Sequence, residues 1–224
     1  MAMQEDIELP YLTEGYLGKQ MKFDSYGLIT VSHPDPFIKM ESDRVEIIIG
    51  TTEKIRMTTK MISMATKKEC NEYSLVRIQG PNFCFLLRPP VQGFYKFQIY
   101  GLPSGEAGPQ MQGVINYVVY CPGLAADVQP FPKQYPQWKD GCYLFEPYTI
   151  PKGTKEPVRF KVYVPKAKDV QVKVGNDWNP LEQTEPGTFE GTVDLSANYP
   201  PNTLAKLNVK YMGNNYNTLL EYKL

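Results

Sequence analysis

The residues of this chain that could perform nucleophilic catalysis are one histidine and four cysteines. In a Cys–His enzyme the imidazole must lie within hydrogen-bond reach of the thiol whose proton it takes. The histidine, His33, stands in the segment SHPDP, two residues before Asp35, and it precedes every cysteine: Cys70, Cys84, Cys121 and Cys142. His33 and Asp35 could form a catalytic pair or half of a metal site, but a histidine followed by proline in an early loop is more often structural. We therefore predict that the chain is not an enzyme.

The cysteine spacings fit no CxxC metal motif, so we expect neither a metal ion nor another cofactor. Residues 1–12 lack a basic segment followed by an apolar one, which predicts no secretory signal and a cytoplasmic location. In a reducing compartment thiols stay free and pack as small hydrophobic groups. The strand-like contexts NFCFLL and GCYLF indicate that Cys84 and Cys142 are buried in this way.

The two tryptophans are the candidate partner-binding residues. Trp178 follows the turn residues Gly-Asn-Asp, which favour a sandwich tip or rim. An exposed Trp178 could anchor a protein partner or a sugar ring; alternatively, it folds back over the end of the core. Trp138 follows a proline-rich stretch and is expected to pack the start of the second half of the chain.

The charge balance excludes two classes of partner. Lys+Arg and Asp+Glu both number 24, so we expect neither nucleic acid nor an acidic membrane surface. The longest apolar runs are strand-sized, and we expect no membrane span. A basic stretch could bind phosphate or anionic lipid, but Glu53 and Glu69 flank it, which is typical of a solvated edge strand. Its basic residues are Lys54, Arg56, Lys60, Lys67 and Lys68.

The segments that must position these residues have the sequence pattern of short β-strands. The segments VRFKVYVP (158–165) and DVQVKVG (169–175) alternate apolar and polar residues. Proline and glycine turns separate such segments, and no stretch sustains a helical period over three turns. The pattern predicts an all-β protein made of immunoglobulin-like β-sandwiches.

The stretch GFYKFQIYGLPSGEAGPQMQGVINYVVYC (93–121) predicts the hairpin of the last two strands of such a sandwich. Immunoglobulin domains carry a corner tyrosine two residues before their second disulfide cysteine. Tyr95 fits the corner position, with Phe97 replacing the cysteine as in a reduced domain. In the second half, Phe189 would take the corner position without the hydroxyl.

We therefore predict two tandem immunoglobulin-like β-sandwich domains joined by a Pro-rich linker. The expected segments are an N-terminal lead-in (1–22), sandwich 1 (23–122), the linker (123–137) and sandwich 2 (138–224). The linker holds Pro130, Pro132 and Pro136, and proline favours extended, stiff connectors.

Several blocks resemble a known family. They are FDSYGLITVSHP (23–34), GFYKFQIYGLP (93–103), GVINYVVYC (113–121), PFPKQYPQWKDGCYLFEP (130–147), VRFKVYVPKAKDVQVKV (158–174) and NTLLEYKL (217–224). These blocks resemble the C-terminal tandem immunoglobulin-like modules that follow the transglutaminase-like core in kyphoscoliosis-peptidase and hillarin-type proteins. The resemblance implies an accessory region of a cytoskeleton-associated protein, with filamin-like or septin-like partners. The Cys-His-Asp core of that family maps onto no position here.

Three functions follow as hypotheses. The first is a non-catalytic interaction region that recruits a cytoskeletal protein, with exposed strand edges as one means of binding. The second is a carbohydrate-binding pair of β-sandwich modules, suggested by the aromatic loops. The third, a self-contained hydrolase, would have to use His33 as its only histidine base.

Overall fold

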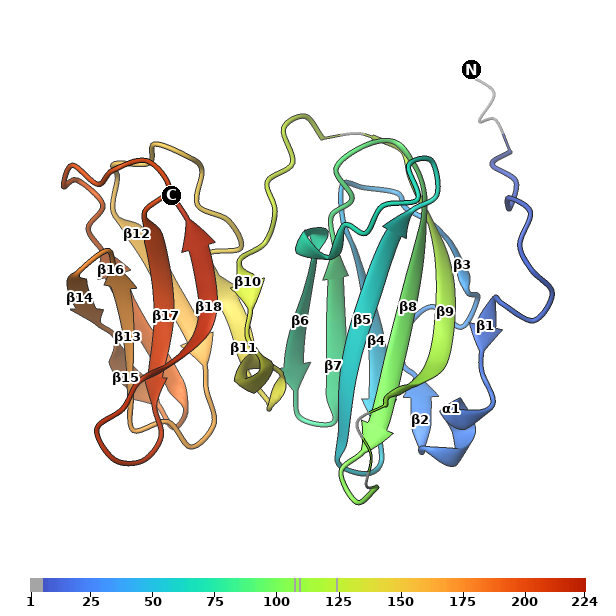
Figure 1. The fold of residues 1–224 in the computed structure, drawn as a ribbon, viewed down its shortest axis with the longest axis horizontal. Coiled ribbons are helices and arrows are strands. Elements are labelled where there is room, and N and C mark those ends of the chain that lie inside the picture. The colour runs from blue at the N-terminus through green and yellow to red at the C-terminus, as the bar shows by residue number, and fades with distance from the viewer. Residues whose placement is uncertain (1–5, 107, 109, 124) are drawn as a thin grey trace. The chain divides into compact units, whose positions relative to one another are not determined.

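The computed structural model describes residues 6–106, 108, 110–123 and 125–224, and nearly all of its regular structure is β (Figure 1). This confirms the prediction of an all-β, immunoglobulin-like chain. Two compact units divide the chain: Met1–Ser74 with Phe85–Val128, and Leu75–Cys84 with Gln129–Leu224. No helix in the described part is long and apolar enough to cross a membrane.

The first unit is built around a sheet of order β1-β9-β8-β5, with β3 parallel to β9. Its strands are β1 (Gly18–Lys19), β3 (Phe37–Lys39), β5 (Ile55–Ser63), β8 (Gly93–Pro103) and β9 (Gln112–Cys121). A separate sheet has the order β2-β4-β7-β6, made of β2 (Leu28–Thr30), β4 (Val45–Thr51), β7 (Asn82–Leu87) and β6 (Ser74–Gln79). Most of β6 and the first residues of β7 are grouped with the second unit. The short helices are α1 (Lys22–Ser25) and η1 (Asn71–Tyr73).

The hairpin β8–β9 confirms the interpretation of residues 93–121. Its register pairs Tyr95 with Val119, and both side chains are buried. The Tyr95 hydroxyl donates a hydrogen bond of 2.8 Å to the carbonyl of Val91 and accepts one from its N–H at 3.3 Å. This is the tyrosine corner of immunoglobulin sandwiches. Phe97 is fully buried and meets the ring of Phe85 edge-on, with centroids 5.9 Å apart, so it fills the core where a disulfide would lie.

The second unit has two sheets, of order β10-β18-β17-β13-β14 and β11-β12-β16-β15. The first contains β10 (Lys133–Gln134), β13 (Asp169–Val174), β14 (Asp177–Pro180), β17 (Leu204–Lys210) and β18 (Asn217–Lys223). The other contains β11 (Tyr143–Glu146), β12 (Val158–Tyr163), β15 (Glu182–Glu185) and β16 (Thr188–Val193). The alternation predicted for β13 is confirmed, because Val170, Val172 and Val174 are all fully buried.

The corner assigned to Phe189 is wrong. Phe189 lies on β16, which pairs with β12 and β15, whereas the final hairpin is β17–β18. The glycine before it, Gly187, has φ +80°, and a Cβ there would come within 2.5 Å of the Tyr163 ring. The Gly-x-aromatic pattern therefore marks a tight turn against Tyr163 rather than a tyrosine corner.

The segment Leu75–Cys84, which contains most of β6, is held by backbone and side-chain contacts of the second unit. Ile78 N–H donates to the carbonyl of Cys142 at 2.9 Å. Val76 N–H donates to the side-chain oxygen of Gln134 at 3.0 Å. The Arg77 guanidinium lies 4.7 Å from the Tyr143 ring centroid and 5.3 Å from that of Tyr148. Residues distant in sequence thus complete the second unit.

Candidate protein-interaction site

Trp178 is an exposed aromatic residue on β14, the last strand of its sheet. Its side chain is 45% exposed. The two-residue loop 175–176 joins β13 to β14 and sets Lys173 opposite Trp178. Lys173 Nζ lies 5.2 Å from the Trp178 ring centroid, and the Tyr216 ring lies 5.0 Å away at a tilt of 52°. Trp178 therefore stands at the surface in an aromatic pair flanked by a cation.

The outward side chains of β13 continue this surface. Because the valines of β13 point into the core, Asp169, Gln171 and Lys173 point the other way. Gln171 Nε2 donates to Asp169 Oδ2 at 2.9 Å and to the Tyr216 hydroxyl at 3.1 Å. The Tyr216 hydroxyl itself donates to the Asp169 carboxylate. We call Asp169, Gln171, Lys173, Trp178 and Tyr216 the Trp178 surface.

The charges of the Trp178 surface are fixed by these bonds. Burial opposes ionisation of Asp169, but the hydrogen bonds from Tyr216 and Gln171 outweigh it and lower the pKa of the carboxyl. Lys210, whose ammonium lies 5.6 Å from the Tyr216 ring centroid, adds to this effect. The hydrogen bond to Asp169 in turn raises the pKa of Tyr216. The Trp178 surface thus presents a carboxylate, the ammonium group of Lys173 and two aromatic rings, with Lys210 beside it.

Trp138 does not share this exposure. It lies in the short helix η2 (Pro136–Lys139), is fully buried, and donates its indole N–H to the carbonyl of Val76 at 2.8 Å. A partner could not reach this ring in the folded chain. We therefore correct the expectation of partner binding at Trp138: the residue packs the second unit.

His33 and Asp35 line a cleft of about 630 Å³ in the first unit. His33 Nδ1 lies 2.8 Å from the hydroxyl of Ser32, and Asp35 accepts a hydrogen bond from the N–H of Phe37 at 3.0 Å. Burial lowers the pKa of His33, so its ring is neutral near pH 7. Both side chains are used in holding the loop between β2 and β3. In the described residues no group of three or more His, Cys, Asp or Glu side chains could hold a metal ion.

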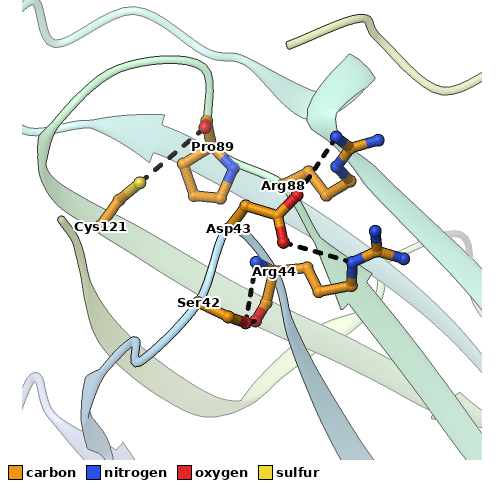
Figure 2. Close-up of polar contacts among 6 residues, drawn as sticks. All are labelled: Ser42, Asp43, Arg44, Arg88, Pro89 and Cys121. Carbon is orange, nitrogen blue, oxygen red and sulfur yellow. Dashed lines mark hydrogen bonds and ion pairs between the residues drawn. The ribbon is translucent and has the colours of Figure 1, made fainter. Parts of the chain in front are cut away.

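Figure 2 shows a second polar cluster, centred on Asp43. Its carboxylate accepts from Arg44 Nε at 3.5 Å and from Arg88 Nη2 at 3.4 Å. The Ser42 hydroxyl donates to the carbonyl of Arg44 at 2.9 Å. The thiol of Cys121 lies 3.9 Å from the carbonyl oxygen of Pro89, which is labelled in the same figure. The contacts of Ser42 and Asp43 hold the loop before β4.

The cysteines are buried, and burial raises the pKa of Cys70 to about 11 and that of Cys142 to about 12. A raised thiol pKa lowers the fraction of reactive thiolate. At pH 8 we therefore expect iodoacetamide to label Cys70 and Cys142 at least roughly a hundred-fold more slowly in the folded chain than in denaturant. Mass spectrometry of timed samples measures this. Rapid labelling of native Cys142 would contradict its assignment as a core residue.

A family model described as "KY-like, immunoglobulin-like domain" matches residues 10–132. Human kyphoscoliosis peptidase is 23% identical over 221 residues, which cover 97% of this chain and 33% of that protein. The chain thus spans about a third of the length of this curated relative.

Two chaperones are among the solved structures that the chain matches. The E. coli chaperone DraB is 13% identical, with a TM-score of 0.30, over 89% of this chain and 98% of DraB. The periplasmic chaperone SfaE is 10% identical, with a TM-score of 0.29, over 86% of this chain and 98% of SfaE.

Proposed function

The chain belongs to the KY-like immunoglobulin-like domain family, and on this basis we propose that it is a non-catalytic protein-interaction region. In this proposal it is the C-terminal accessory part of a cytoplasmic, cytoskeleton-associated transglutaminase-like protein and recruits a cytoskeletal partner. The observation that carries the proposal is the exposure of Trp178 beside Tyr216 on an edge strand. Tryptophan and tyrosine are enriched among the residues that dominate binding energies at protein interfaces.

The arrangement of the Trp178 surface supports a protein partner. Its two rings offer apolar area at little cost in side-chain entropy, because the hydrogen bond from Gln171 holds Tyr216 and the Lys173 cation contact holds Trp178. Lys173 and Lys210 would meet acidic groups at the rim, which favours specificity and rapid association. Pro180 lacks an N–H and so hinders the pairing of an added strand with β14, which makes binding through side chains the better fit.

Trp178→Ala tests the proposal. We expect at least a roughly ten-fold loss of affinity for the partner, with a change of no more than a few degrees in Tm, because the ring is half exposed. Immobilised full-length chain, with purified filamin-type and septin-type proteins as probes, gives the affinities. Calorimetry gives the Tm.

Phe145→Ala is the matched control. Phe145 is also aromatic, is 41% exposed, and likewise stands beside a tyrosine and a lysine, Tyr143 at 4.9 Å and Lys161 at 4.8 Å. This variant should bind as the parent chain does. Equal losses in both variants, or none in Trp178→Ala, would contradict the role of the Trp178 surface.

Carbohydrate binding remains the second candidate, because Gln171 and Asp169 place hydrogen-bonding groups beside an aromatic ring. However, Lys173 lies over the Trp178 ring, where a sugar would stack. Saturable binding on a glycan array at micromolar concentration, lost in Trp178→Ala, would favour this candidate over a protein partner.

A further inference from the structure

The strand β5 ends its sheet and is unusually well suited to pair with another chain. It has nine residues, and its register with β8 runs without interruption from Ile55 opposite Pro103 to Ser63 opposite Tyr95. In Figure 1 it lies beside β8, on the side away from β9. The strand contains neither proline nor glycine. A long, regular edge of this kind is a template for an added strand.

The pairing of Met61 shows which backbone groups of β5 point outward. Met61 N–H donates to the side-chain oxygen of Asn71 at 2.7 Å, and its carbonyl accepts from Cys70 N–H at 2.8 Å. Both groups therefore point away from β8. In an antiparallel ladder the direction alternates along the strand, so the N–H and C=O groups of Met57 and Thr59 also point away from β8. Residues 67–71 cover the far end of the edge, because Ser63 N–H donates to the carbonyl of Lys68 and Ile62 is bridged to Glu69. The part of the edge available to a partner therefore runs from Ile55 to Thr59.

Other strands that end sheets carry features that hinder pairing. In β14, Pro180 cannot donate, and in β15 a register shift between Gln183 and Glu185 disturbs the ladder. A similar shift lies between Leu144 and Glu146 in β11. β5 has neither the proline nor the register shift, although Arg56 and Lys60 charge its outer face and so disfavour a strand of like charge.

The side chains of β5 determine the charge that an added strand would meet. Ile55, Met57 and Met61 are buried, so Arg56 and Lys60 point to the outer face. Lys60 pairs with Glu69 at 3.5 Å, and both side chains are well exposed. Among the described residues Lys54 and Arg56 form no ion pair. The outer face of β5 therefore carries the charge of Arg56 and that of Lys60, which Glu69 partly offsets.

We propose that β5 binds an extended, acidic segment of a partner protein as an additional antiparallel strand, through the backbone groups of Met57 and Thr59. Residues directly opposite each other in such a pair point to the same face. The partner would thus carry two acidic residues four positions apart, opposite Arg56 and Lys60. This inference shares the premise of the proposed function that the chain binds proteins, but it uses a different surface.

Charge argues against a second copy of this chain as the occupant. A two-fold pairing of β5 through Met57 and Thr59 sets Arg56 of one copy opposite Lys60 of the other. Like charges directly opposite each other destabilise a strand pair. An acidic segment removes this repulsion and gains two attractive pairs.

The test uses the full chain and a blocked, labelled peptide, Thr-Val-Glu-Val-Thr-Val-Glu-Val-Thr, with a control peptide in which both Glu are Lys. Fluorescence anisotropy gives the affinity, and NMR follows the amide protons. We expect saturable binding of the acidic peptide only, with slowed hydrogen exchange at the amides of Met57 and Thr59. The double variant with Arg56→Glu and Lys60→Glu should lose at least about ten-fold in affinity and gain binding of the basic peptide.

Backbone pairing is tested separately by Thr59→Pro and its control, Thr59→Val. Proline is tolerated where an edge N–H faces solvent, so Thr59→Pro removes the outward donor, whereas Thr59→Val keeps it. We expect weaker binding in the first variant only. Trp178→Ala should leave peptide binding unchanged, so failure here and failure of the Trp178 surface are distinguishable.

Four results would overturn the inference. One is no saturable binding of the acidic peptide up to about 1 mM. Another is binding that survives both Thr59→Pro and charge reversal. A third is binding that inorganic tripolyphosphate displaces while the Met57 and Thr59 amides show no protection from exchange, because the site would then attract anions without pairing a strand. The last is concentration-dependent protection of these amides without peptide, which would identify a second copy as the occupant.

Discussion

Replacing Trp138 with alanine is expected to lower the free energy of unfolding of the second unit by about 3–5 kcal/mol. The indole is fully buried, so the substitution leaves a large cavity. It also removes the 2.8 Å hydrogen bond that satisfies the carbonyl of Val76, and an unsatisfied buried carbonyl adds to the cost. Since Val76 lies in the segment 75–84, loss of this hydrogen bond should also weaken the contacts between β6 and the rest of the second unit. Urea unfolding followed by circular dichroism measures the change.

Two variants separate the contributions at Trp138. Trp138→Phe keeps most of the apolar volume but not the N–H donor, so it should cost clearly less than alanine while still leaving Val76 unsatisfied. Trp178→Ala, at a half-exposed position, should cost about 1 kcal/mol or less. A loss of under about 1 kcal/mol in Trp138→Ala would be inconsistent with its place in the core.

The second large effect is expected from Tyr95→Phe, which should destabilise the first unit by about 1–3 kcal/mol. The hydroxyl of Tyr95 bonds both the carbonyl and the N–H of Val91. Tyr95 is buried in the core, whereas Val91 is 62% exposed. Removal of the hydroxyl leaves the corner between β7 and β8 without these bonds. Chemical denaturation with a probe specific to the first unit measures the change.

Tyr117→Phe is the matched control for Tyr95→Phe. Tyr117 lies in the same sheet and is fully buried, but its hydroxyl has no hydrogen-bond partner in the described chain. Its removal should therefore be neutral or slightly stabilising. If the two variants were equally destabilised, the corner hydrogen bonds would not be the cause.

Alkaline pH gives an independent check on Tyr95. Burial raises the pKa of Tyr95 to about 12, above the value near 10 of an unfolded tyrosine. A raised folded pKa contributes stability that is fully present below pH 10 and is lost as the pH rises through 12. The stability difference between the parent chain and Tyr95→Phe should therefore shrink between pH 10 and 12. A difference that stays constant over this window would contradict the burial of a protonated hydroxyl.

The strand content and the first sandwich's corner could be predicted from sequence because both depend on local patterns. Alternation along β13 reflects one buried face, and that face is visible in the order of apolar residues. Tyr95 and Phe97 are two residues apart on one strand, so their common orientation into the core follows from the strand itself. The same local reasoning placed a corner wrongly at Phe189. A turn glycine can precede a strand of either sheet, so it does not identify the strand that carries the corner residue.

The candidate sites could not be predicted from sequence, because they are formed by contacts between residues that are distant in the chain. The loop at 175–176 indicates that Lys173 lies opposite Trp178, but nothing local indicates that Tyr216 packs against the same ring. That the N–H and C=O groups of Met57 and Thr59 point away from β8 follows only from the hydrogen bonds of Met61 to residues 70–71 in the folded chain.

By itself the sequence determined the fold class, the free and apolar context of the cysteines, and the resemblance to the kyphoscoliosis-peptidase family. Only the tertiary structure decided which tryptophan is buried and which is exposed. Both follow turn or proline-rich residues, and burial depends on what packs against the ring: Trp138 meets Val76, 62 residues away in the chain, whereas Trp178 lies on the last strand of a sheet. Such long-range packing is set by how the strands assemble, which no local pattern encodes.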